Sequence, residues 1–589
     1  MSEYGDNQET VHVKNIVVGT DDFETLIKWN GYFVDKTRFI PQFLRWSQVK
    51  LITRPRRFGK TMTLSMLRHF FEMNYLDPQD RSRQMRLFSG LDIMKNEGFV
   101  RKNMGSWPVI FITFKGIEGL NFDAAVHELF ATMQFVCNNF AFLLDSQKVS
   151  LLAKNILKKI IQMDENDADE QILLLKKAVF ALEEALFSFC GQQVIVLIDE
   201  YDVPLMKARE NGYYDHMLDL IRVMLGRALK TSPYVAGAVL MGCLRISKES
   251  VFTGMNNFTS YSISSEALSG VIGFTQDEAD KVLCDFQLED CREQAKAYYG
   301  GYRFGSTEMY CPWDLLSFCA ATIEAGRPQF ENFWINTSSN NLILEFVKFA
   351  DDEHLEKLHA LINGETVSAN IDEDMSFAEL NLRHSAAQLM SLLYHTGYLT
   401  KVGECEEGAV LRIPNKEVQE CFRRQIEAFF SASNQDFFKD GSKLFSGLMS
   451  GNANVVEGLL TWYLKRFISI RDIGAESHYH GFLLGMLAAG RPDQWRGDIE
   501  SNQEAGSGYA DITIADAETS TAVVIELKKA ERSSDAALEA MRRTALEQVE
   551  SRGYAEKFRR YRTIYLYGIA FSAKTCAVEM RRTTGTEAF

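Results

Sequence analysis

Short apolar runs alternate with longer helical stretches over the first 240 or so residues of the chain. The apolar runs have the length of buried strands. Strands separated by helices favour a parallel sheet with both faces covered, so we predict such a sheet here. The expected strands are 50–53, 109–114, 194–198 and 235–241, and the clearest helices are 122–143 and 172–189.

The pattern changes twice further along the chain. From about residue 275 to 435 it is mostly helical, with aromatic-rich turns. Beyond 436, helices precede two strands at 510–514 and 522–527, and a helix at 534–552 leads to a strand at 563–570. We therefore predict an α/β protein of three domains: 1–274 with the parallel sheet, 275–435 as a helical middle region, and 436–589 as a small α/β domain.

Composition narrows the class of protein. A chain of 589 residues is expected to form two to four domains, and its 46% hydrophobic and 24% charged content is that of a soluble globular protein. The sequence shows no apolar stretch of membrane-spanning length, and its polar, acidic start is unlike a signal peptide. Ten scattered cysteines without a Cys-x-x-Cys pair argue against a zinc site and predict reduced thiols in the cytoplasm.

The formal net charge of −15 is unfavourable for a nucleic-acid-binding protein as a whole. Local charge nevertheless governs contact with phosphate. The segment 528–562 is rich in lysine and arginine with interspersed glutamates. Two interpretations stay open for this segment: a solvated helix surface, or a face that follows a phosphate backbone.

A phosphate-binding motif follows the first predicted strand, as Arg56-Arg57-Phe58-Gly59-Lys60-Thr61. A strand, a tight loop and Gly-Lys-Thr at a helix start bring backbone N–H groups and the helix dipole to a phosphate. Lys60 is expected to reach the β- and γ-phosphates of ATP, and the Thr61 hydroxyl to bind Mg²⁺. Arg54 stands where the first glycine of Gly-x-x-x-x-Gly-Lys-Thr would be.

The predicted strand 194–198 ends in two acidic residues, Asp199 and Glu200. A buried strand delivers Asp199 to the carboxyl edge of the sheet, near the same Mg²⁺. Glu200 would then orient or deprotonate an attacking water. The alternative is a hydrophobic strand that merely ends in acids.

Four arginines accompany this predicted ATP site. Arg54, Arg56 and Arg57 would bind phosphate, or pair with Asp202 or a neighbouring subunit. Arg245 follows the predicted strand 235–241, where an arginine can sense the γ-phosphate or form an ordinary salt bridge. An arginine that acts in trans, such as Arg57, would require a homo-oligomer.

A second candidate site lies near the end of the chain. Glu526 and Lys528 are two apart on a predicted strand and so project from one face, whereas Leu527 points into the packing. Asp511 lies on the preceding strand, close enough to share a metal with Glu526. Two carboxylates suit Mg²⁺, with Mn²⁺ as an alternative ion, and a bound metal would activate water beside a phosphodiester. Lys528 would orient that water or stabilise the reacting phosphate.

Neighbouring helices offer further candidates for this site. Glu476 and His480 share one face of a predicted helix, so Glu476 would add a carboxylate, whereas His480 also fits a structural role. Gln548 lies in the helix that is expected to end at Gly553. Gln548 would face the site, and Tyr554 would cap the helix or contact substrate. Packing is the alternative for both residues.

At these residues the chain resembles a bacterial fusion of an AAA-ATPase-like domain with a PD-(D/E)XK nuclease-superfamily domain. The resemblance covers nearly the whole chain. It rests on ordered stretches: 31–37 (GYFVDKT), 53–61 (TRPRRFGKT), 199–202 (DEYD), 245–250 (RISKES), 298–304 (YYGGYRF), 334–339 (WINTSS), 479–481 (YHG), 501–504 (SNQE) and 568–571 (GIAF).

The resemblance implies a P-loop NTPase sheet, a helical middle region and a restriction-endonuclease-like core. It also accounts for Arg54, because the loop of that family resembles Arg-Pro-Arg-Arg-Phe-Gly-Lys-Thr. The Gln-x-x-x-Tyr helix of the wider superfamily is stretched here, with Tyr554 six residues after Gln548. Tyr554 is therefore a weaker candidate than Asp511, Glu526 and Lys528.

The preferred hypothesis is an ATP-controlled, Mg²⁺-dependent hydrolase that cleaves DNA rather than RNA. One alternative is a switch in which ATP changes the affinity of the last domain for nucleic acid or protein without cleavage. Another is a remodelling ATPase whose nuclease-like domain only docks a target. The net charge favours the switch, and the intact Asp…Glu-x-Lys set favours the nuclease.

Overall fold

The computed structural model divides the chain into two compact units, which are described separately. Unit 1 comprises Met1–Ser338 and Ser368–Val418, and unit 2 comprises Ser339–Val367 and Gln419–Phe589. The structure describes residues 14–44, 49–163, 167–230, 232–244, 257–333, 357–358, 360–372, 386–406, 408–432, 435–467, 476–491, 495, 497–505, 508–530, 535–572 and 575–585. Within these residues, no helix has the length and apolar character needed to cross a membrane.

The centre of unit 1 is a five-stranded parallel sheet in the order β2-β3-β4-β1-β5. Its strands are β1 (Val49–Thr53), β2 (Val109–Thr113), β3 (Val194–Asp199), β4 (Val235–Gly242) and β5 (Phe258–Tyr261). All four predicted strands are present, and β5 was not predicted. The mixed α/β class with a parallel sheet is confirmed.

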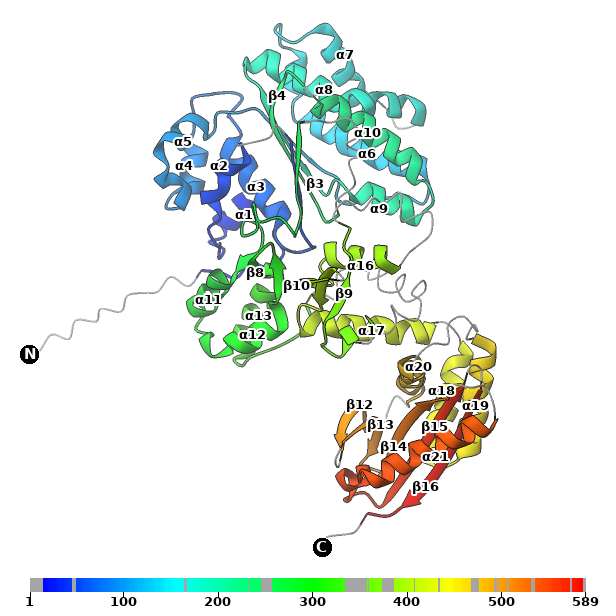
Figure 1. Cartoon of the computed structure of the whole chain (residues 1–589). Coiled ribbons are helices and arrows are strands. Elements are labelled where there is room, and N and C mark those ends of the chain that lie inside the picture. The colour runs from blue at the N-terminus through cyan, green and yellow to red at the C-terminus, as the bar shows by residue number, and fades with distance from the viewer. Residues whose placement is uncertain are drawn as a thin grey trace, which may run out of the picture. The chain divides into compact units, whose positions relative to one another are not determined.

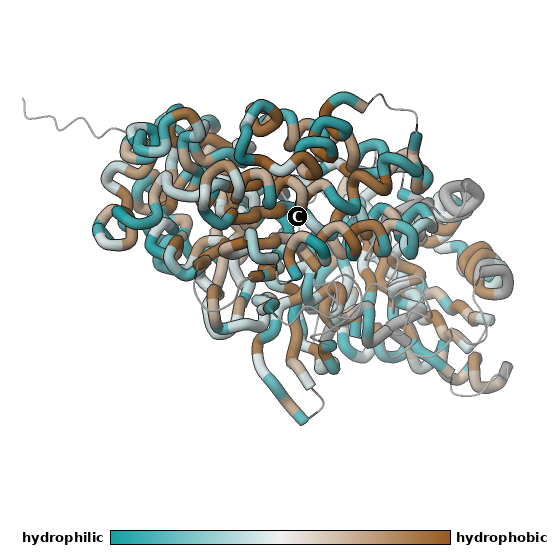
Figure 2. Tube along the Cα trace, turned by 90° about the horizontal axis from the view of Figure 1, so that it is seen from above, coloured by the Kyte–Doolittle hydropathy of each residue, from teal (hydrophilic) through white to brown (hydrophobic). Residues whose placement is uncertain are grey.

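Helices cover both faces of this sheet (Figure 1). One side carries α1 (Phe23–Lys28), α2 (Ile40–Phe43), α3 (Lys60–Phe71), α4 (Ser82–Phe88) and α5 (Glu97–Asn103). The other carries α6 (Phe122–Asn138), α7 (Leu151–Gln162), α8 (Ala168–Cys190), α9 (Val203–Glu210) and α10 (Tyr214–Leu229). Hydrophobic and hydrophilic positions alternate along the helical turns (Figure 2), as expected for helices with one buried face.

The part of unit 1 that follows the sheet contains strands as well as helices. A three-stranded sheet, β6-β8-β7, packs with α11 (Gln276–Asp285), α12 (Arg292–Tyr299) and α13 (Pro312–Ala325). Its strands are β6 (Phe274–Thr275), β7 (Tyr302–Phe304) and β8 (Thr307–Tyr310). We call residues 270–325 the lid. Another sheet is formed by β9 (Val367–Ala369), β10 (Thr400–Cys405) and β11 (Gly408–Arg412). Helix α16 (Ala386–His395) also belongs to unit 1, whereas α17 (Lys416–Ala432) begins in unit 1 and continues into unit 2.

The mostly helical pattern predicted for 275–435 is therefore incomplete, because these short strands carry little periodicity of their own. The three-domain division itself stays a prediction.

Unit 2 is built on a mixed sheet in the order β12-β13-β14-β15-β16. Only the pair β14–β15 is parallel. The strands are β12 (Asp498–Ala505), β13 (Gly508–Asp516), β14 (Thr521–Lys529), β15 (Thr563–Ser572) and β16 (Thr575–Thr583). The predicted strands within β13, β14 and β15 are confirmed, and β12 and β16 were not predicted.

The two faces of this sheet are covered by different helices. Val523, Ile525 and Leu527 of β14 pack against α18 (Gln435–Met449), α19 (Ala453–Phe467) and α20 (Glu476–Gly490). Residues of the alternate parity, Ala522 and Val524, pack under α21 (Asp535–Ser551). By the same alternation, Glu526 and Lys528 project toward the α21 face. The strand thus brings these two side chains to the helix that carries Gln548.

Candidate functional sites

The first candidate site is the loop between β1 and α3. Gly59 is the residue before α3 and adopts φ 89°, a left-handed conformation that favours glycine. Arg57 adopts φ 67° without being glycine. Such backbone conformations cost free energy in an L-residue and cluster at functional sites. The loop is therefore held in a defined, strained shape at the start of the helix.

The predicted lysine, threonine and aspartate of this site lie together. Thr61 Oγ1 donates to Asp199 Oδ2 at 2.7 Å, which joins the start of α3 to the end of β3. Lys60 is buried, and its Nζ donates to the carbonyl oxygens of Arg54 at 3.0 Å and Pro55 at 2.8 Å. Lys60 Nζ also lies 3.4 Å from Cys243 Sγ, which belongs to the residue after β4. The loop, β3 and β4 thus converge on one point at the carboxyl edge of the sheet.

These residues fit a nucleotide phosphate with Mg²⁺. Among the described residues, the buried Asp199 Oδ1 has no hydrogen-bond partner, and such an oxygen is costly unless something binds it. Burial raises the pKa of Asp199, and the Thr61 hydroxyl offsets part of that shift. A hydroxyl and a carboxylate oxygen are ligands that Mg²⁺ accepts, and Lys60 supplies a cation for phosphate. Thr61, Asp199 and Lys60 would therefore hold the metal and the phosphates.

Glu200 follows Asp199 in a left-handed conformation, with φ 52°. Burial and then the neighbouring Asp199 raise the pKa of Glu200, which suits a group that exchanges a proton with water. The next two residues hold the end of β4. Asp202 Oδ2 accepts from the backbone N–H groups of Cys243 and Leu244, each at 2.8 Å, and the Tyr201 hydroxyl donates to the Leu244 carbonyl. The predicted sensor Arg245 lies outside the described residues.

The arginines of the loop have three different surroundings. Arg54 is fully buried, and its guanidinium donates to the carbonyl oxygens of Thr53, Tyr261, Ser262 and Leu268 at 2.8–3.1 Å. Burial lowers the pKa of Arg54 to about 10. Its position excludes phosphate binding and pairing with Asp202, because the side chain is fully buried and backbone carbonyls bind both of its terminal nitrogens.

Arg56 and Arg57 differ from Arg54. Arg56 lies beside Cys243, near Asp202. The Arg57 guanidinium stacks on the ring of Trp313 in the lid, with Cζ 4.1 Å from the ring centroid. Phe58 is also directed into packing, against Tyr302 at 5.0 Å and Phe304 at 5.1 Å between ring centroids. Phe58 would therefore offer a phosphate its backbone N–H and not its ring.

An apolar pocket of about 160 Å³ adjoins the loop. Its walls come from three parts of unit 1: the segment 17–36, the loop with α3, and the lid. Val18, Met62 and Trp313 are one lining residue from each part. An apolar pocket beside a phosphate site suits a planar base. Sequence reasoning missed this pocket because its lining residues share no motif.

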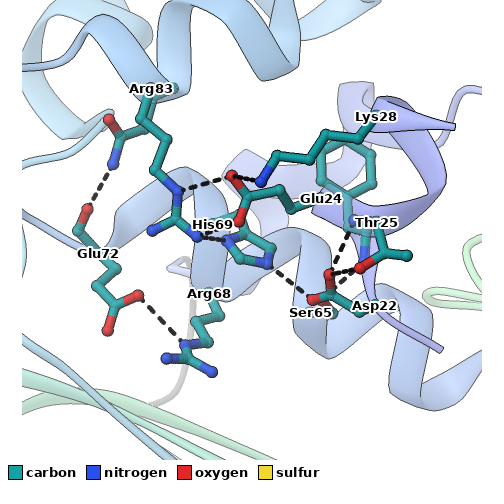
Figure 3. Close-up of polar contacts among 11 residues, drawn as sticks. Asp22, Glu24, Thr25, Lys28, Ser65, Arg68, His69, Glu72 and Arg83 are labelled. Atoms are coloured by element: carbon teal, nitrogen blue, oxygen red, sulfur yellow. Dashed lines mark hydrogen bonds and ion pairs between the residues drawn. The ribbon is translucent and has the colours of Figure 1, made fainter. Parts of the chain in front are cut away.

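The segment 17–36 is fixed to α3 by a polar network centred on His69 (Figure 3). Asp22 Oδ2 lies 2.9 Å from both Ser65 Oγ and His69 Nε2, and Ser65 Oγ accepts from the Phe23 N–H. His69 Nδ1 lies 3.0 Å from Arg83 of α4, which also pairs with Glu24. The Arg83 guanidinium lowers the pKa of Glu24 to about 2. The network holds the first wall of the apolar pocket against the helix that starts at Lys60.

A larger cleft of about 720 Å³ opens at the opposite end of α3. Arg68, Tyr75 and Phe111 are among its lining residues. Its lining includes none of the residues of the Gly59-Lys60-Thr61 loop, so we place no phosphate chemistry there.

The second candidate site lies on the α21 face of the sheet of unit 2. Glu526 Oε1 accepts from Lys528 Nζ at 3.0 Å and from Gln548 Nε2 of α21. Glu526 is almost fully buried. Strands β13 and β14 are antiparallel, with Ile512 opposite Ile525. Asp511 therefore lies opposite Glu526 on the neighbouring strand. Asp511 Oδ2 accepts from the Leu527 N–H at 2.7 Å. The structure thus brings Asp511, Glu526, Lys528 and Gln548 together.

Two other predicted residues are buried and contact members of this site. Tyr554 is fully buried, and its hydroxyl lies 3.4 Å from Gln548 Nε2. Because Tyr554 is buried, it cannot contact a substrate directly. Packing beside Gln548 is the expected role that fits. His480 of α20 is buried, and its Nε2 lies 2.9 Å from the Asp511 carbonyl and 3.2 Å from Ser501 Oγ. Glu476 is the first residue of α20, and the structure does not describe its side chain.

Glycine at position 568 allows α21 to approach this site. A Cβ on Gly568 would lie 2.5 Å from the Arg542 carbonyl oxygen and 2.6 Å from the Leu546 nitrogen, both on α21. Because Gly568 pairs with Glu526 across β14 and β15, the close approach occurs beside the carboxylate. Helix α21 can therefore bring Gln548 into contact with Glu526.

The donor set suits a hard divalent cation. Asp511 and Glu526 supply carboxylate oxygens, the ligands that Mg²⁺ and Mn²⁺ prefer. Within the described residues, no group of three or more His, Cys, Asp or Glu side chains is arranged to hold a metal. Asp511 and Glu526 would therefore need water or substrate oxygens to complete an octahedral shell, as nucleic-acid enzymes with Mg²⁺ generally do.

Comparison with known proteins gives a separate family match for each of two ranges of the chain. Residues 17–252 match the model of a family described as predicted AAA-ATPase. Residues 474–581 match the model of the PD-(D/E)XK nuclease superfamily. These ranges contain the loop at 59–61 with Asp199, and Asp511 with Glu526, Lys528 and Gln548, respectively.

Two individual proteins were also found by comparison. One is described as an uncharacterized protein in the vnfD 5′ region of Azotobacter chroococcum mcd 1, and it is 25% identical over 590 residues, which cover 96% of this chain and 98% of that protein. A solved structure from Pyrococcus horikoshii, a signal transduction ATPase with numerous domains and a tetratricopeptide repeat sensor, is 13% identical with a TM-score of 0.24. That match covers 74% of this chain, and the chain spans half the length of that protein. One polypeptide thus carries a match to a predicted AAA-ATPase family over residues 17–252 and a match to the PD-(D/E)XK nuclease superfamily over residues 474–581.

Proposed function

We propose that this protein is an ATP-controlled, divalent-metal-dependent nuclease that cleaves DNA. The observation that carries the proposal is the arrangement at Glu526. Its carboxylate receives Lys528 and Gln548, and Asp511 is fixed on the neighbouring strand by the Leu527 N–H. The same chain holds a P-loop in which Thr61 and Asp199 already meet.

Each residue of the second site has a defined task in this proposal. A bound divalent cation would supply an activated water and neutralise charge on the scissile phosphate. Asp511 and Glu526 would hold the cation, and Lys528 would orient the water or stabilise the phosphate. Gln548 would fix the Glu526 carboxylate, and Tyr554 would support Gln548 from the interior.

In unit 1, Lys60 would bind the phosphates of ATP, and Thr61 and Asp199 the Mg²⁺. Glu200 would orient or deprotonate the attacking water. Each of the residues with a described side chain lies at the carboxyl edge of one parallel sheet, where such ligands bind. The apolar pocket formed by the segment 17–36 and the lid would take the base. Arg57 stacks on Trp313 at the same pocket, so it would act on the lid or, in a homo-oligomer, on a neighbouring subunit.

The test is a cleavage assay with the purified full chain. Single- and double-stranded DNA and RNA are incubated with Mg²⁺ or Mn²⁺, with and without ATP. We expect metal-dependent cleavage of DNA that changes when ATP is added. Glu526→Gln and Lys528→Ala should each lower the rate at least about a hundredfold, because general acid–base and electrostatic contributions are of that size. ADP should bind both variants as it binds the wild type.

Lys529→Ala is the matched control, because this lysine is the next residue on β14 and projects from the opposite face. Its cleavage rate should stay close to that of the wild type. Equal cleavage by the wild type and the two site variants would refute the nuclease assignment.

One observation, the net charge of −15, supports an alternative function. In that alternative, ATP changes the shape of the protein, and unit 2 binds nucleic acid or protein without cutting. Retained binding of a DNA probe to unit 2, together with no cleavage in either metal, would favour the switch over the nuclease.

A further inference from the structure

The lid is fastened to the segment 17–36 at both ends of helix α11. At the first turn, Lys36 Nζ donates to Glu278 Oε2 at 2.5 Å and to the Gly270 carbonyl at 2.7 Å. In the last turn, the Tyr32 hydroxyl donates to Asp285 Oδ2 at 2.6 Å, and its ring packs on Phe286 with centroids 4.9 Å apart. Tyr32 and Lys36 therefore contact opposite ends of α11.

The two attachments differ in burial. The side chains of Lys36 and Glu278 are 8% and 15% exposed, so this ion pair lies in a largely dehydrated environment. Removal of one partner of such a pair leaves a charge that water does not solvate. At the other attachment, the Tyr32–Asp285 hydrogen bond is exposed, and the Asp285 side chain is 36% exposed and also pairs with Lys281, which is 70% exposed. Surface pairs contribute little to stability. The energetically important attachment is therefore the one at Lys36.

This attachment stands beside the apolar pocket. Tyr32, Lys36 and the lid residue Trp313 all line the pocket, whereas Glu278 does not. The other wall is fixed to α3 through Asp22, Ser65 and His69. The segment 17–36 thus joins the phosphate-binding helix to the lid. The distance between the pocket walls depends on both attachments.

We propose that the Lys36–Glu278 ion pair is a positioning device that sets the lid against the base pocket. It would contribute to affinity for the base of a nucleotide and not for its phosphates, which Lys60 and Thr61 bind at the other side. This inference rests on the proposed ATP site. It adds two residues that touch neither the phosphates nor the metal, and it assigns their effect to one part of the ligand.

The test compares two ligands that share a diphosphate. ADP and inorganic pyrophosphate are titrated, each with Mg²⁺, into the wild type, Lys36→Met, Glu278→Gln and the double variant by calorimetry. We expect each single variant to bind ADP about tenfold more weakly, a change of about 1.4 kcal/mol. Pyrophosphate affinity should stay within about twofold. The double variant should be no weaker than the weaker single variant, because both changes disrupt one interaction.

Controls separate this result from a folding defect. Glu278→Gln is nearly isosteric and keeps an oxygen that can accept from the Thr275 N–H, which Glu278 Oε2 does at 2.9 Å. It therefore carries the test if Lys36→Met does not fold. Lys281→Met, on the exposed side of the same helix, should bind ADP as the wild type does.

Three outcomes overturn the inference: unchanged ADP affinity in both single variants, equal losses for ADP and pyrophosphate, or losses that add in the double variant. A wild-type chain that binds neither ligand overturns the ATP site itself, and the inference with it. If the wild type binds pyrophosphate but does not bind ADP more tightly, the apolar pocket does not bind a base. That result contradicts the base pocket and leaves the phosphate site in place.

Discussion

Asp314 in α13 has a fully buried side chain close to the P-loop. Burial raises the pKa of Asp314 to about 7, and the Arg57 guanidinium opposes part of that rise. In the unfolded chain the same carboxyl titrates near its ordinary value of 3.8. Between these values the folded protein holds a proton that the unfolded chain releases. The contribution of Asp314 to stability is therefore greatest below about pH 4 and decreases as the pH rises to about 7.

We therefore expect the stability of unit 1 to decrease between pH 5 and pH 7, and Asp314→Asn to reduce that slope. The measurement is the urea midpoint of unfolding across this pH range, followed for the wild type and the variant. Asp290→Asn, at an exposed position, should keep the wild-type slope. A wild-type slope that persists in Asp314→Asn would show that other groups cause it.

The candidate site residues were predictable from the sequence where they belong to a motif. Lys60, Thr61 and Asp199 were expected together, and they lie together because a parallel sheet collects the carboxyl ends of its strands on one edge. Asp511, Glu526, Lys528 and Gln548 were likewise expected at one site and meet there, although their catalytic roles stay a prediction. Arg54 shows the limit of a motif: it stands in the phosphate loop yet donates to backbone carbonyls.

Other residues carry no local signal at all. Lys36 and Glu278 are 242 positions apart, and a single sequence does not reveal such a pairing. His480 was expected on one helix face, but its contact with the Asp511 carbonyl depends on how α20 packs on β13. The base pocket draws single apolar residues from three parts of unit 1. Tertiary packing alone brings these residues together.

Among the secondary-structure elements, α21 depends on one glycine of the neighbouring strand. A Cβ at position 568 would meet backbone atoms of Arg542 and Leu546, and backbone cannot move aside as a flexible side chain can. We expect Gly568→Ala to destabilise unit 2 by about 1–3 kcal/mol, the usual cost of overpacking. It should also weaken cleavage, because α21 carries Gln548 to Glu526. Denaturant unfolding and the cleavage assay measure the two effects.

Gly458 in α19 is the matched control for this substitution. A Cβ there meets no atom within 4 Å, and alanine favours a helix over glycine. Gly458→Ala should therefore leave stability unchanged or raise it by up to about 1 kcal/mol. Loss of stability in both variants would contradict the explanation by close packing.

The strands that sequence analysis missed are mostly edge strands. β5, β12 and β16 each stand at the end of a sheet. All four residues of β5, Phe258–Tyr261, are partly exposed, and two of them are a threonine and a serine. Edge strands have only one neighbour and need no continuous apolar run, so the pattern that revealed β1 and β3 is weak there. The central strands β1, β3 and β4 of the parallel sheet were predictable for the opposite reason.

The chain as a whole is packed as two compact units. Unit 2 has its own hydrophobic core, formed by α18, α19 and α20 against β13, β14 and β15. Each unit also holds one candidate ligand site, with all the described residues of that site inside the same unit. A ligand that binds one folded unit stabilises that unit directly, by about 2.7 kcal/mol when its concentration is 100 times its Kd.

We therefore expect ligand-specific shifts in the unfolding of the full chain. ADP with Mg²⁺ should raise the midpoint of unit 1, and Mn²⁺ without nucleotide should raise that of unit 2. Lys60→Ala should abolish the first shift and keep the second, because Lys60 touches only the P-loop site. Glu526→Gln should do the reverse. Proteolysis in increasing urea, with fragments assigned by mass spectrometry, reports each unit separately.

The same two ligands and two variants also measure coupling between the units. If ATP controls cleavage through metal binding, nucleotide binding in unit 1 must change the metal affinity of unit 2, and by linkage the metal must change the nucleotide affinity by the same factor. ADP would then change the Mn²⁺ affinity of unit 2 in the wild type and leave it unchanged in Lys60→Ala. Mn²⁺ affinity that is the same with and without both ADP and ATP would leave two independent sites on one chain. ATP control through metal binding would then be wrong, even if each site binds its own ligand.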